Sequence, residues 1–309
     1  MTRIPISSDL VGLDFPAITQ TWTSKDTMLY ALGVGGRPAE DLDFIYEGRG
    51  PKVLPTYAVI PGGAALGGLI RTVDMRLEML LHGEQSIELF RPLPPEASVE
   101  VSGRITEVWD KGKAAVLGVE CVARDTLGDL FRTHATLFVR GAGGFGGERG
   151  PSSADSAVPD RAPDIVASLE TRPEQGAIYR LSGDRNPIHI DPAFASMGGF
   201  DAPFMHGLCT YGIVGRAILR ELCADDPGAF HSFQGRFADR VLYGDTIVTK
   251  IWRIGDGQAI VQGETADGRI VLSQARATFC LWISSITRPS PRPVACRPRP
   301  RCTCTSMRI

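Results

Sequence analysis

Asp184 and His189 lie five residues apart in the stretch YRLSGDRNPIHIDPAFA (179–195), with Asn186 between them. Carboxylates and imidazoles are common general acids and bases, and imidazole changes its charge near neutral pH. Held on one side of a tight loop, the two groups would form an acid–base pair. The spacing therefore predicts proton-transfer chemistry, provided that the surrounding backbone fixes the loop.

The residues around this pair predict such a loop. A helix is expected to end near Ser182, and Gly183 suits the left-handed position that often follows a helix. Asn186 and Asp191 are each followed by proline, the pattern of a capping residue before a helical turn. A purely structural loop is the alternative for all of these residues, and we assign that role to Asp191.

A second element is FMHGLCTYGIVGRAI (204–218), whose apolar and small residues predict a central helix. The first N–H groups of a helix have no partner within it and lie at the positive end of its dipole. An N–H at Gly207 could therefore stabilise a developing oxyanion. His206, just before it, is either a cap at the helix start or a residue near the substrate.

The chain repeats itself with an offset of 149 residues, which places Tyr30 on Tyr179. Similarity within any one window is weak, but the offset is constant and shortens by seven residues only in the last window. The matched windows are 27–36 with 176–185, 54–60 with 203–209, 91–101 with 240–250, and 133–139 with 275–281.

At this offset Gly35 and Glu40 occupy the positions of Asp184 and His189. The first half thus keeps the fold pattern without the acid–histidine pair. A cap that the fold requires should occur in both halves, so the pair predicts a site in the second half only. Different caps can serve the same turn, which leaves the structural alternative open.

Each half has a short helix, a loop, a glycine-rich apolar helix (about 55–71 and 204–223) and three or four strands. This order predicts an α+β fold in which an antiparallel sheet wraps round one apolar helix. Capping boxes are expected from Thr23 to Asp26 and from Thr171 to Glu174. The predicted strands lie at 98–109, 114–125 and 131–141, and at 245–255, 258–267 and 269–282.

The same pattern predicts the domain boundaries. One repeat is expected at 1–140 and the second at 165–285, joined by a linker at 141–164 that is rich in Gly, Pro, Ser and charge. GAGGFG (141–146) matches the dinucleotide-binding pattern G-x-G-x-x-G, but no helix is expected to follow it. We therefore expect no nucleotide site there.

The last segment, 286–309, is expected to be a disordered tail, because it has no hydrophobic period. Residues 288–309 hold six of the 33 basic residues and no acid, which leaves 27 basic against 35 acidic residues and a net charge of −8. A nucleic-acid groove is therefore not expected on the body. A nucleic-acid or membrane tail, or a frame-shifted extension of a chain that ends near Trp282, are alternatives for this segment.

Composition favours an ordinary globular protein, with 43% hydrophobic and 22% charged residues. No apolar run reaches the roughly 20 residues that cross a bilayer. The N-terminus has no apolar core like that of a secretory signal. We therefore expect a cytoplasmic protein without a membrane or nucleic-acid partner.

Other side chains give weaker signals. No G-x-S-x-G motif is present, so a Ser-His-Asp hydrolase is not expected. The remaining histidines have no acid or cysteine at ligand spacing, so no metal site is expected at His82, His134 or His231. The cysteines before the tail are far apart in apolar contexts and are expected to be reduced core thiols: Cys121, Cys209, Cys223 and Cys280.

The stretch 179–195, followed by MHGLCTYG (205–212), resembles the signature of the MaoC-like R-specific 2-enoyl-CoA hydratases. It is similar in particular to the two-repeat form in the hydratase part of peroxisomal multifunctional enzyme type 2. The resemblance extends over roughly residues 15–283 and includes LPTYAVI (54–60) and GGFGGERG (143–150). It implies a double hot-dog fold, one active site per chain, a homodimer, an enoyl-CoA thioester substrate, and no metal or organic cofactor.

Carried over by position, the resemblance makes Asp184 and His189 the catalytic pair, oriented by Asn186, with the Gly207 N–H as oxyanion donor. The degenerate first half would accommodate the acyl chain. Which member of the pair is the formal base stays open, because coupled groups titrate jointly. The remaining residues that would contact the substrate are Gly183, His206 and Tyr57.

One position departs from the family pattern. Many members have a proline before the glycine of the turn that here reads VLYGDT (241–246), where this chain has Tyr243. We expect the change to alter a strand edge but not the chemistry.

Three alternatives for the function remain at this stage. A 3-hydroxyacyl-carrier-protein dehydratase would run the same chemistry in reverse, and a non-catalytic acyl-thioester binding protein would keep only the pocket. Thioester hydrolysis is the third. The sequence indicates neither the acyl chain length nor the physiological direction.

Overall fold

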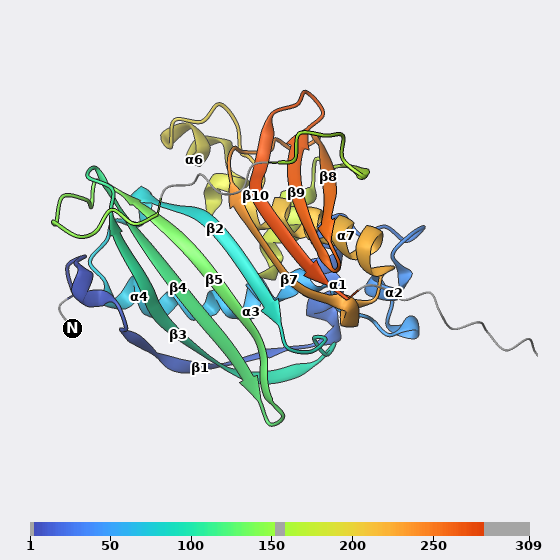
Figure 1. Cartoon of the computed structure of the whole chain (residues 1–309), viewed down its shortest axis with the longest axis horizontal. Helices are drawn as coiled ribbons and strands as arrows, with labels where there is room; N and C mark the ends of the chain where they lie inside the picture. The colour runs from blue at the N-terminus through green and yellow to red at the C-terminus, as the bar shows by residue number, and fades with distance from the viewer. Residues whose placement is uncertain (1–2, 152–157, 281–309) are drawn as a thin grey trace, which may run out of the picture.

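The computed structural model describes residues 3–151 and 158–280 (Figure 1). The segment expected to be a tail, and the chain end expected near Trp282, lie outside these residues. No helix within them is long and apolar enough to cross a membrane.

Ten strands form one continuous sheet in the order β1-β3-β4-β5-β2-β7-β10-β9-β8-β6. The first five positions belong to the first half of the chain and the last five to the second, and every neighbouring pair is antiparallel. The first-half strands are β1 (Asp14–Trp22), β2 (Leu80–Leu89), β3 (Ala97–Asp110), β4 (Ala114–Asp125) and β5 (Gly128–Arg140). The second-half strands are β6 (Ile165–Glu170), β7 (Phe230–Phe237), β8 (Thr246–Gly255), β9 (Gln258–Thr265) and β10 (Ile270–Phe279).

The middle of the sheet confirms the predicted repeat. Glu84 of β2 pairs with Arg236 of β7, and Ile87 pairs with Phe233. At the offset of 149 residues, Glu84 corresponds to Phe233 and Ile87 corresponds to Arg236. The two pairs are therefore equivalent positions of the repeat, with the strands exchanged. The two halves are therefore joined edge to edge about an approximate two-fold axis.

The central helix of the second half is confirmed, although it begins at Gly207 rather than at 204. This helix, α7 (Gly207–Cys223), packs against β7, β8 and β10, and most of its residues are buried. It ends at Ala224 in the left-handed conformation. Figure 1 shows α3, α4 and α7 on one face of the strands.

The first-half counterpart is not the single helix that was predicted over 55–71. It is divided into η3 (Pro55–Ala58), α3 (Val59–Ala64) and α4 (Leu66–Thr72). Pro61 lacks an N–H to bond one turn back, and the adjacent Gly62 and Gly63 are poor helix formers, so the segment is divided on either side of these residues, before Val59 and at Ala65.

The remaining helical segments are short, and most lie in loops. The α-helices are α1 (Ser24–Gly33), α2 (Leu42–Ile45), α5 (Gln175–Tyr179) and α6 (Pro192–Met197). The 3₁₀ turns are η1 (Ser8–Leu10), η2 (Glu47–Arg49), η4 (Leu77–Met79), η5 (Arg180–Ser182), η6 (Pro187–His189) and η7 (Pro227–Ala229).

One of the two predicted capping boxes is present. The Asp26 carboxylate accepts the Thr23 backbone N–H at 2.8 Å at the start of α1. The box predicted at Thr171 is wrong, because the Thr171 hydroxyl donates instead to the carbonyl of Asp245 at 2.8 Å. A contact with a distant turn replaces the local cap.

The described part of the linker, 141–151 and 158–164, contains neither helix nor strand. Two of its glycines, together with Gly112 of the β3–β4 turn, surround a carboxylate of this same chain, since Asp110 accepts the N–H groups of Gly112, Gly144 and Gly146 at 2.8, 2.8 and 2.9 Å. These backbone donors lower the pKa of Asp110. The GAGGFG pattern thus anchors the linker to the end of β3, and no helix follows it.

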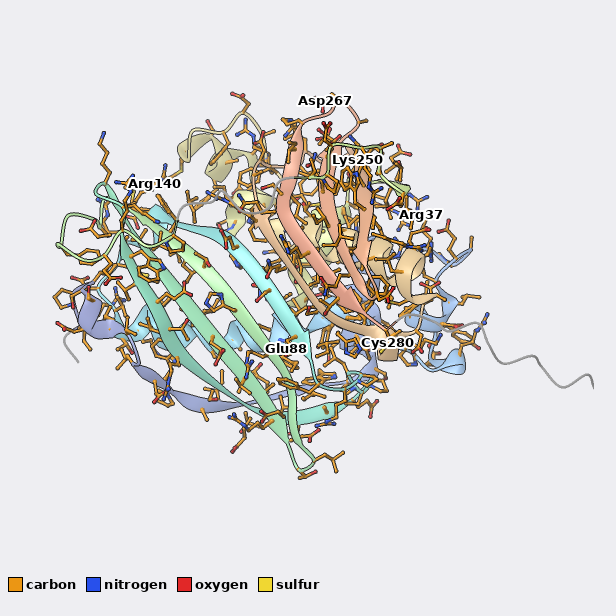
Figure 2. The ribbon with its side chains drawn as sticks, in the orientation of Figure 1. Arg37, Glu88, Arg140, Lys250, Asp267 and Cys280 are labelled. Carbon is orange, nitrogen blue, oxygen red and sulfur yellow. The ribbon has the colours of Figure 1, made fainter. Side chains whose placement is uncertain are left out.

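Three of the four cysteines predicted to be core thiols are buried, but Cys280 is exposed. It follows β10 at the end of the sheet, where Figure 2 labels it beside the start of β7. Its Sγ lies 2.9 Å from Nε2 of His231. The core prediction is therefore wrong for Cys280, since the sheet ends before it and no further layer covers it within the described residues.

Candidate active site

The loop between η5 and α6 has the backbone that its sequence predicts. Gly183 has a φ of +150°, a conformation that side chains rarely adopt. The side-chain oxygen of Asn186 accepts the N–H of Ile188 at 3.1 Å and so caps the turn that carries His189. Asp191 accepts the N–H of Ala193 at 2.9 Å and starts α6, as expected for a structural cap.

This loop and the start of α7 bring Asp184, His189 and His206 together. One polar atom of each lies within 4.8 Å of the others. Asp184 is exposed, His189 is half-buried and His206 is buried. Two hydrogen bonds of about 2.8 Å span such a gap, so a single water molecule fits between the carboxylate and an imidazole.

Hydrogen bonds fix both ends of the predicted pair. The Asp184 carboxylate accepts the backbone N–H of Asn186 at 3.0 Å. Nδ1 of His189 donates to the carbonyl of Phe204 at 2.9 Å, which leaves Nε2 of the neutral ring as a proton acceptor. The structure thus orients Asp184 through the backbone of Asn186 and His189 through a carbonyl 15 residues away.

His206 lies under this pair. Only 1% of its surface is exposed, and its Nε2 donates to the backbone carbonyl of Asp184 at 3.1 Å. Its ring faces that of His189 with a centroid distance of 3.8 Å, and the ring of Tyr179 lies 5.0 Å from it. The expected contact between the His206 side chain and a substrate is not supported, because the side chain is buried and holds the loop.

Burial lowers the pKa of both histidines. For His189 the effect is opposed by the hydrogen bond to Phe204 and by the negative charge of Asp184. For His206 burial and the neighbouring His189 lower the pKa to about 4. Both rings are therefore neutral near pH 7, which suits His189 to accept a proton.

The three ligand-type side chains do not suit a metal ion. A nitrogen binds a metal in the plane of its ring, whereas these two rings face each other with an interplanar angle of 31°. One nitrogen of each ring is already bonded to a carbonyl oxygen. The arrangement is better matched to a water molecule held between proton-transfer groups.

The predicted donor, the N–H of Gly207, lies at a helix start. This glycine is the first residue of the 17-residue helix α7 and is exposed, and its N–H makes no hydrogen bond with any described residue. A Cβ at this position would lie 3.2 Å from Cδ1 of Phe237, so the glycine permits the close approach of that ring. An unpaired N–H at a helix start is a suitable site for an oxyanion.

The first half contributes to the walls of the site. A Cβ on Gly183 would lie 3.9 Å from Cγ2 of Ile60, which places the loop beside α3. Tyr57, predicted to contact the substrate, is only 3% exposed and packs edge-on against Trp22 and Tyr30 in the core. Its expected contact is not supported by this position.

His82 was not identified from the sequence as part of the site. It lies on β2 beside the other half, and its ring contacts Phe237 edge-on with a centroid distance of 5.1 Å. Burial lowers its pKa to about 4, against the opposing effects of its bond to Glu84 and of the Asp184 charge. No local signal marks His82, because only the pairing of β2 with β7 brings it near Asp184.

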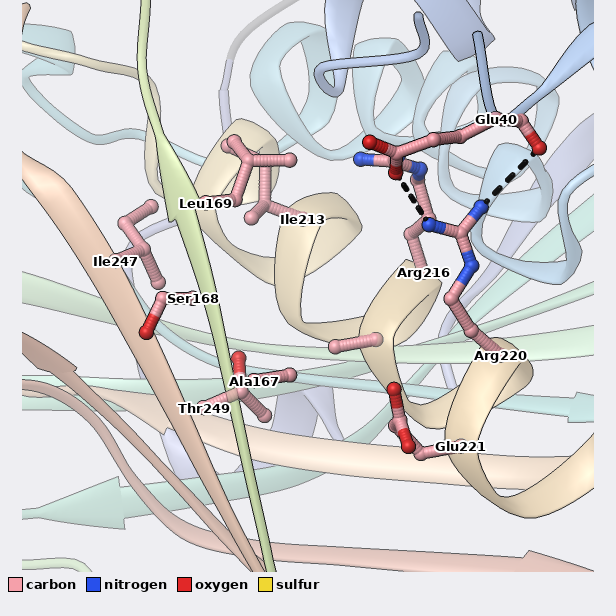
Figure 3. Close-up of a pocket in the computed structure, with 11 residues that line it drawn as sticks. Glu40, Ala167, Ser168, Leu169, Ile213, Arg216, Arg220, Glu221, Ile247 and Thr249 are labelled. Carbon is pink, nitrogen blue, oxygen red and sulfur yellow. Dashed lines mark hydrogen bonds and ion pairs between the residues drawn. The ribbon is translucent and has the colours of Figure 1, made fainter.

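The first-half counterpart of the loop holds ion pairs in place of an acid–histidine pair (Figure 3). Glu40, at the repeat position of His189, pairs with Arg220 at 2.7 Å. Asp41 pairs with Arg216 at 2.6 Å, and both of these side chains are buried. A cavity of about 230 Å³ lies beside these arginines, between α7, β6 and β8.

Comparisons with known proteins identify the family of the chain. Two family models match in succession, the MFE-2 hydratase 2 N-terminal domain over residues 20–141 and the MaoC-like domain over residues 155–273. The chain is 40% identical over 266 residues to the probable enoyl-CoA hydratase 2 of Dictyostelium discoideum, covering 82% of this chain and 90% of that protein. It is 41% identical over 271 residues to the 3-hydroxyacyl-thioester dehydratase Y of Mycobacterium tuberculosis, covering 84% and 93%.

Solved structures show the same fold. A MaoC-like dehydratase from Phytophthora capsici superposes with a TM-score of 0.81 at 29% identity, over 91% of this chain and 100% of that one. A conserved hypothetical protein of Mycobacterium tuberculosis with a double hotdog fold superposes with a TM-score of 0.51 at 13% identity, over 87% and 96%. The chain belongs to the two-repeat, double hot-dog members of the MaoC-like family, together with the enoyl-CoA hydratases 2.

Proposed function

We propose that this protein is an R-specific 2-enoyl-CoA hydratase, which adds water across the double bond of a trans-2-enoyl-CoA to give the (3R)-hydroxyacyl-CoA. The observation that carries the proposal is the placement of Asp184 and His189 on one capped loop, beside the helix start where the N–H of Gly207 has no acceptor among the described residues. The family relatives named as enoyl-CoA hydratases support the same assignment.

The site offers each group that the reaction needs. A water molecule held by Asp184 and His189 adds its oxygen to C3 and gives up a proton to the pair. The double-bond electrons move to the thioester oxygen, which the Gly207 N–H stabilises as an enolate. A proton from the pair then returns to C2 on the same face, so the site ends in its starting protonation state.

General acid–base catalysis of this kind contributes about 10² to 10⁴ in rate, and one oxyanion donor about 3 kcal/mol. Hydration is neither an oxidation nor a reduction, so the scheme requires no redox cofactor. Asp184 and His189 are proposed to act as a unit, without a division of the formal base between them.

The reverse reaction uses the same groups. The similarity to a 3-hydroxyacyl-thioester dehydratase favours dehydration as a second physiological role of this site. A comparison of CoA and carrier-protein thioesters in both directions would separate the two roles.

We further infer a homodimer and a cytoplasmic location. The dimer rests on the family resemblance and is tested by the molar mass in solution. The location is a prediction, and imaging of the tagged chain in its own cell tests it.

The decisive experiment mixes the purified protein with crotonyl-CoA and follows the loss of the conjugated enoyl-thioester absorbance. Chiral analysis should identify the (3R)-hydroxybutyryl-CoA product. Release of free thiol would indicate hydrolysis instead. No conversion of crotonyl-CoA or of a longer enoyl-CoA would reject the hydratase and favour a carrier-protein dehydratase or a binding protein.

A further inference from the structure

Tyr243, the residue at which the chain departs from the family pattern, contacts the candidate site directly. Its hydroxyl lies 2.7 Å from the carbonyl oxygen of His189 and 3.1 Å from that of Phe204. The same Phe204 oxygen accepts the Nδ1–H of His189 at 2.9 Å. One tyrosine therefore borders both the backbone of His189 and the carbonyl that orients its ring.

The surrounding structure is built to admit this side chain. Tyr243 lies in the turn between β7 and β8, and a Cβ on Gly176 of α5 would overlap its hydroxyl. Burial raises the pKa of Tyr243, so the phenol stays protonated and remains a donor. A proline at this position would have neither a ring hydroxyl nor any other donor.

We propose that Tyr243 is a positioning residue for His189, which fixes the loop carbonyl and shares the Phe204 acceptor, and so keeps Nε2 as the proton-accepting nitrogen. The effect of Tyr243 on catalysis rests on the proposed function.

Loss of the hydroxyl should change the basicity of His189 in a defined direction. A carbonyl that no longer borders the phenol accepts the Nδ1–H of the imidazolium more strongly, which raises the pKa of His189. A loosened loop would also admit water and lessen the burial that lowers this pKa. Both effects raise the pKa of His189 toward the ordinary value for histidine.

The other charged or titratable groups around His189 come from several elements. Asp184 lies on the same loop and His206 at the start of α7. Beyond them, Tyr179 and Arg180 lie near His206, and His82 of β2 lies near Asp184. The substitution of Tyr243 changes none of them.

The test compares Tyr243→Phe with Tyr211→Phe. Tyr211 is a matched control, because it is buried in α7 and its hydroxyl also donates to a backbone carbonyl at 2.7 Å, that of Phe233. For Tyr243→Phe we expect kcat to fall about tenfold with KM changed less than about twofold. The acidic limb of its pH–rate profile should move to higher pH, whereas Tyr211→Phe should keep the wild-type profile.

An NMR titration of the His189 ring gives a second readout that needs no substrate. The chain has five histidines, and the signal that disappears in His189→Ala identifies His189 among them. A rise of about half a pH unit or more in the pKa of His189 in Tyr243→Phe supports the proposal. An unchanged His189 titration, or the same shift in Tyr211→Phe, overturns it even if the wild type hydrates crotonyl-CoA.

Failure of the proposed function gives a different result. The wild type would then convert no enoyl-CoA, while the pKa of His189 would still differ between the wild type and Tyr243→Phe. If Tyr243→Phe folds poorly, Tyr243→Leu replaces it, since leucine also lacks the hydroxyl and is smaller than the tyrosine side chain. The same two measurements and the same outcomes apply to it.

Discussion

The rings of His189 and His206 lie face to face, 3.8 Å apart and tilted by 31°, and each donates one N–H to a backbone carbonyl. A proton on either ring would place a positive charge against the other. The pair is therefore stable only while at least one ring is neutral, and burial adds to that preference.

Stability should fall when the solution is made acidic. The pKa of His206 is about 4 in the folded protein, below its ordinary value of 6.5, so the unfolded chain binds a proton first as the pH falls. The titration of His206 leaves the free energy of unfolding unchanged above pH 6.5. It lowers this free energy by about 3 kcal/mol in total as the pH falls from 6.5 to about 4. Urea unfolding at several pH values measures this slope.

His206→Gln removes the titration but keeps an N–H near the Asp184 carbonyl. We expect it to flatten the loss of stability between pH 6.5 and 4. The same slope in the variant and the wild type would show that His206 does not cause the acid sensitivity.

Asp184→Asn and His189→Ala should each lower kcat more than about a hundredfold, because each removes one member of the acid–base pair. Both side chains lie on a loop, so the unfolding transition should remain cooperative. Steady-state kinetics with crotonyl-CoA measures the effect.

Asp191→Asn is the matched control for these variants. This residue lies on the same loop but only caps α6. Its variant should keep wild-type kcat, as asparagine is an equally good cap. Near-normal activity in Asp184→Asn or His189→Ala would reject the assignment of the pair.

Asn186 can be tested for its two possible roles. Asn186→Ala removes the acceptor for the Ile188 N–H and should cost about 1 kcal/mol of stability together with activity. Asn186→Asp keeps the cap, so recovery of activity in this variant would show that capping is sufficient. Persistent loss of kcat with normal stability would instead indicate that the amide contacts the water or substrate.

The buried pair of Asp41 and Arg216 joins the two halves. Asp41→Asn should lower the free energy of unfolding by about 3–5 kcal/mol, because it leaves the buried Arg216 guanidinium with only the longer contact to the half-exposed Glu40, at 3.8 Å. Asp14→Asn, in the exposed pair with Arg104, should cost less than about 1 kcal/mol. Urea unfolding measures both changes. Equal losses of unfolding free energy in the two variants would show that the buried pair stabilises the fold no more than the exposed one.

Local chemistry explains which parts of the site could be predicted from the sequence. The positive φ at Gly183 and the caps at Asn186 and Asp191 depend on neighbours in the chain, and all three are confirmed. The repeat offset was also predictable, since it depends on the whole pattern of both halves.

Contacts between distant segments explain what was missed. His82 reaches the site from the first half and has no motif of its own. Tyr243 was noted within its turn, but its contact with the His189 loop depends on how the β7–β8 turn packs. Thr171 failed as a cap because Asp245 competes for its hydroxyl. The edge strands β1 and β6 and the central strands β2 and β7 were not located, since their identity depends on their partners in the sheet.

The pairing of β2 with β7 also limits how the protein can be divided. A separate second half would carry every residue of the proposed pair, but it would expose the unpaired backbone of β7 along its edge. Two such halves could then join through β7 about the same axis and form an assembly with two complete sites. The fused chain occupies one of those places with Glu40 and its arginine partner, so it holds a single acid–histidine pair where the symmetric assembly would hold two.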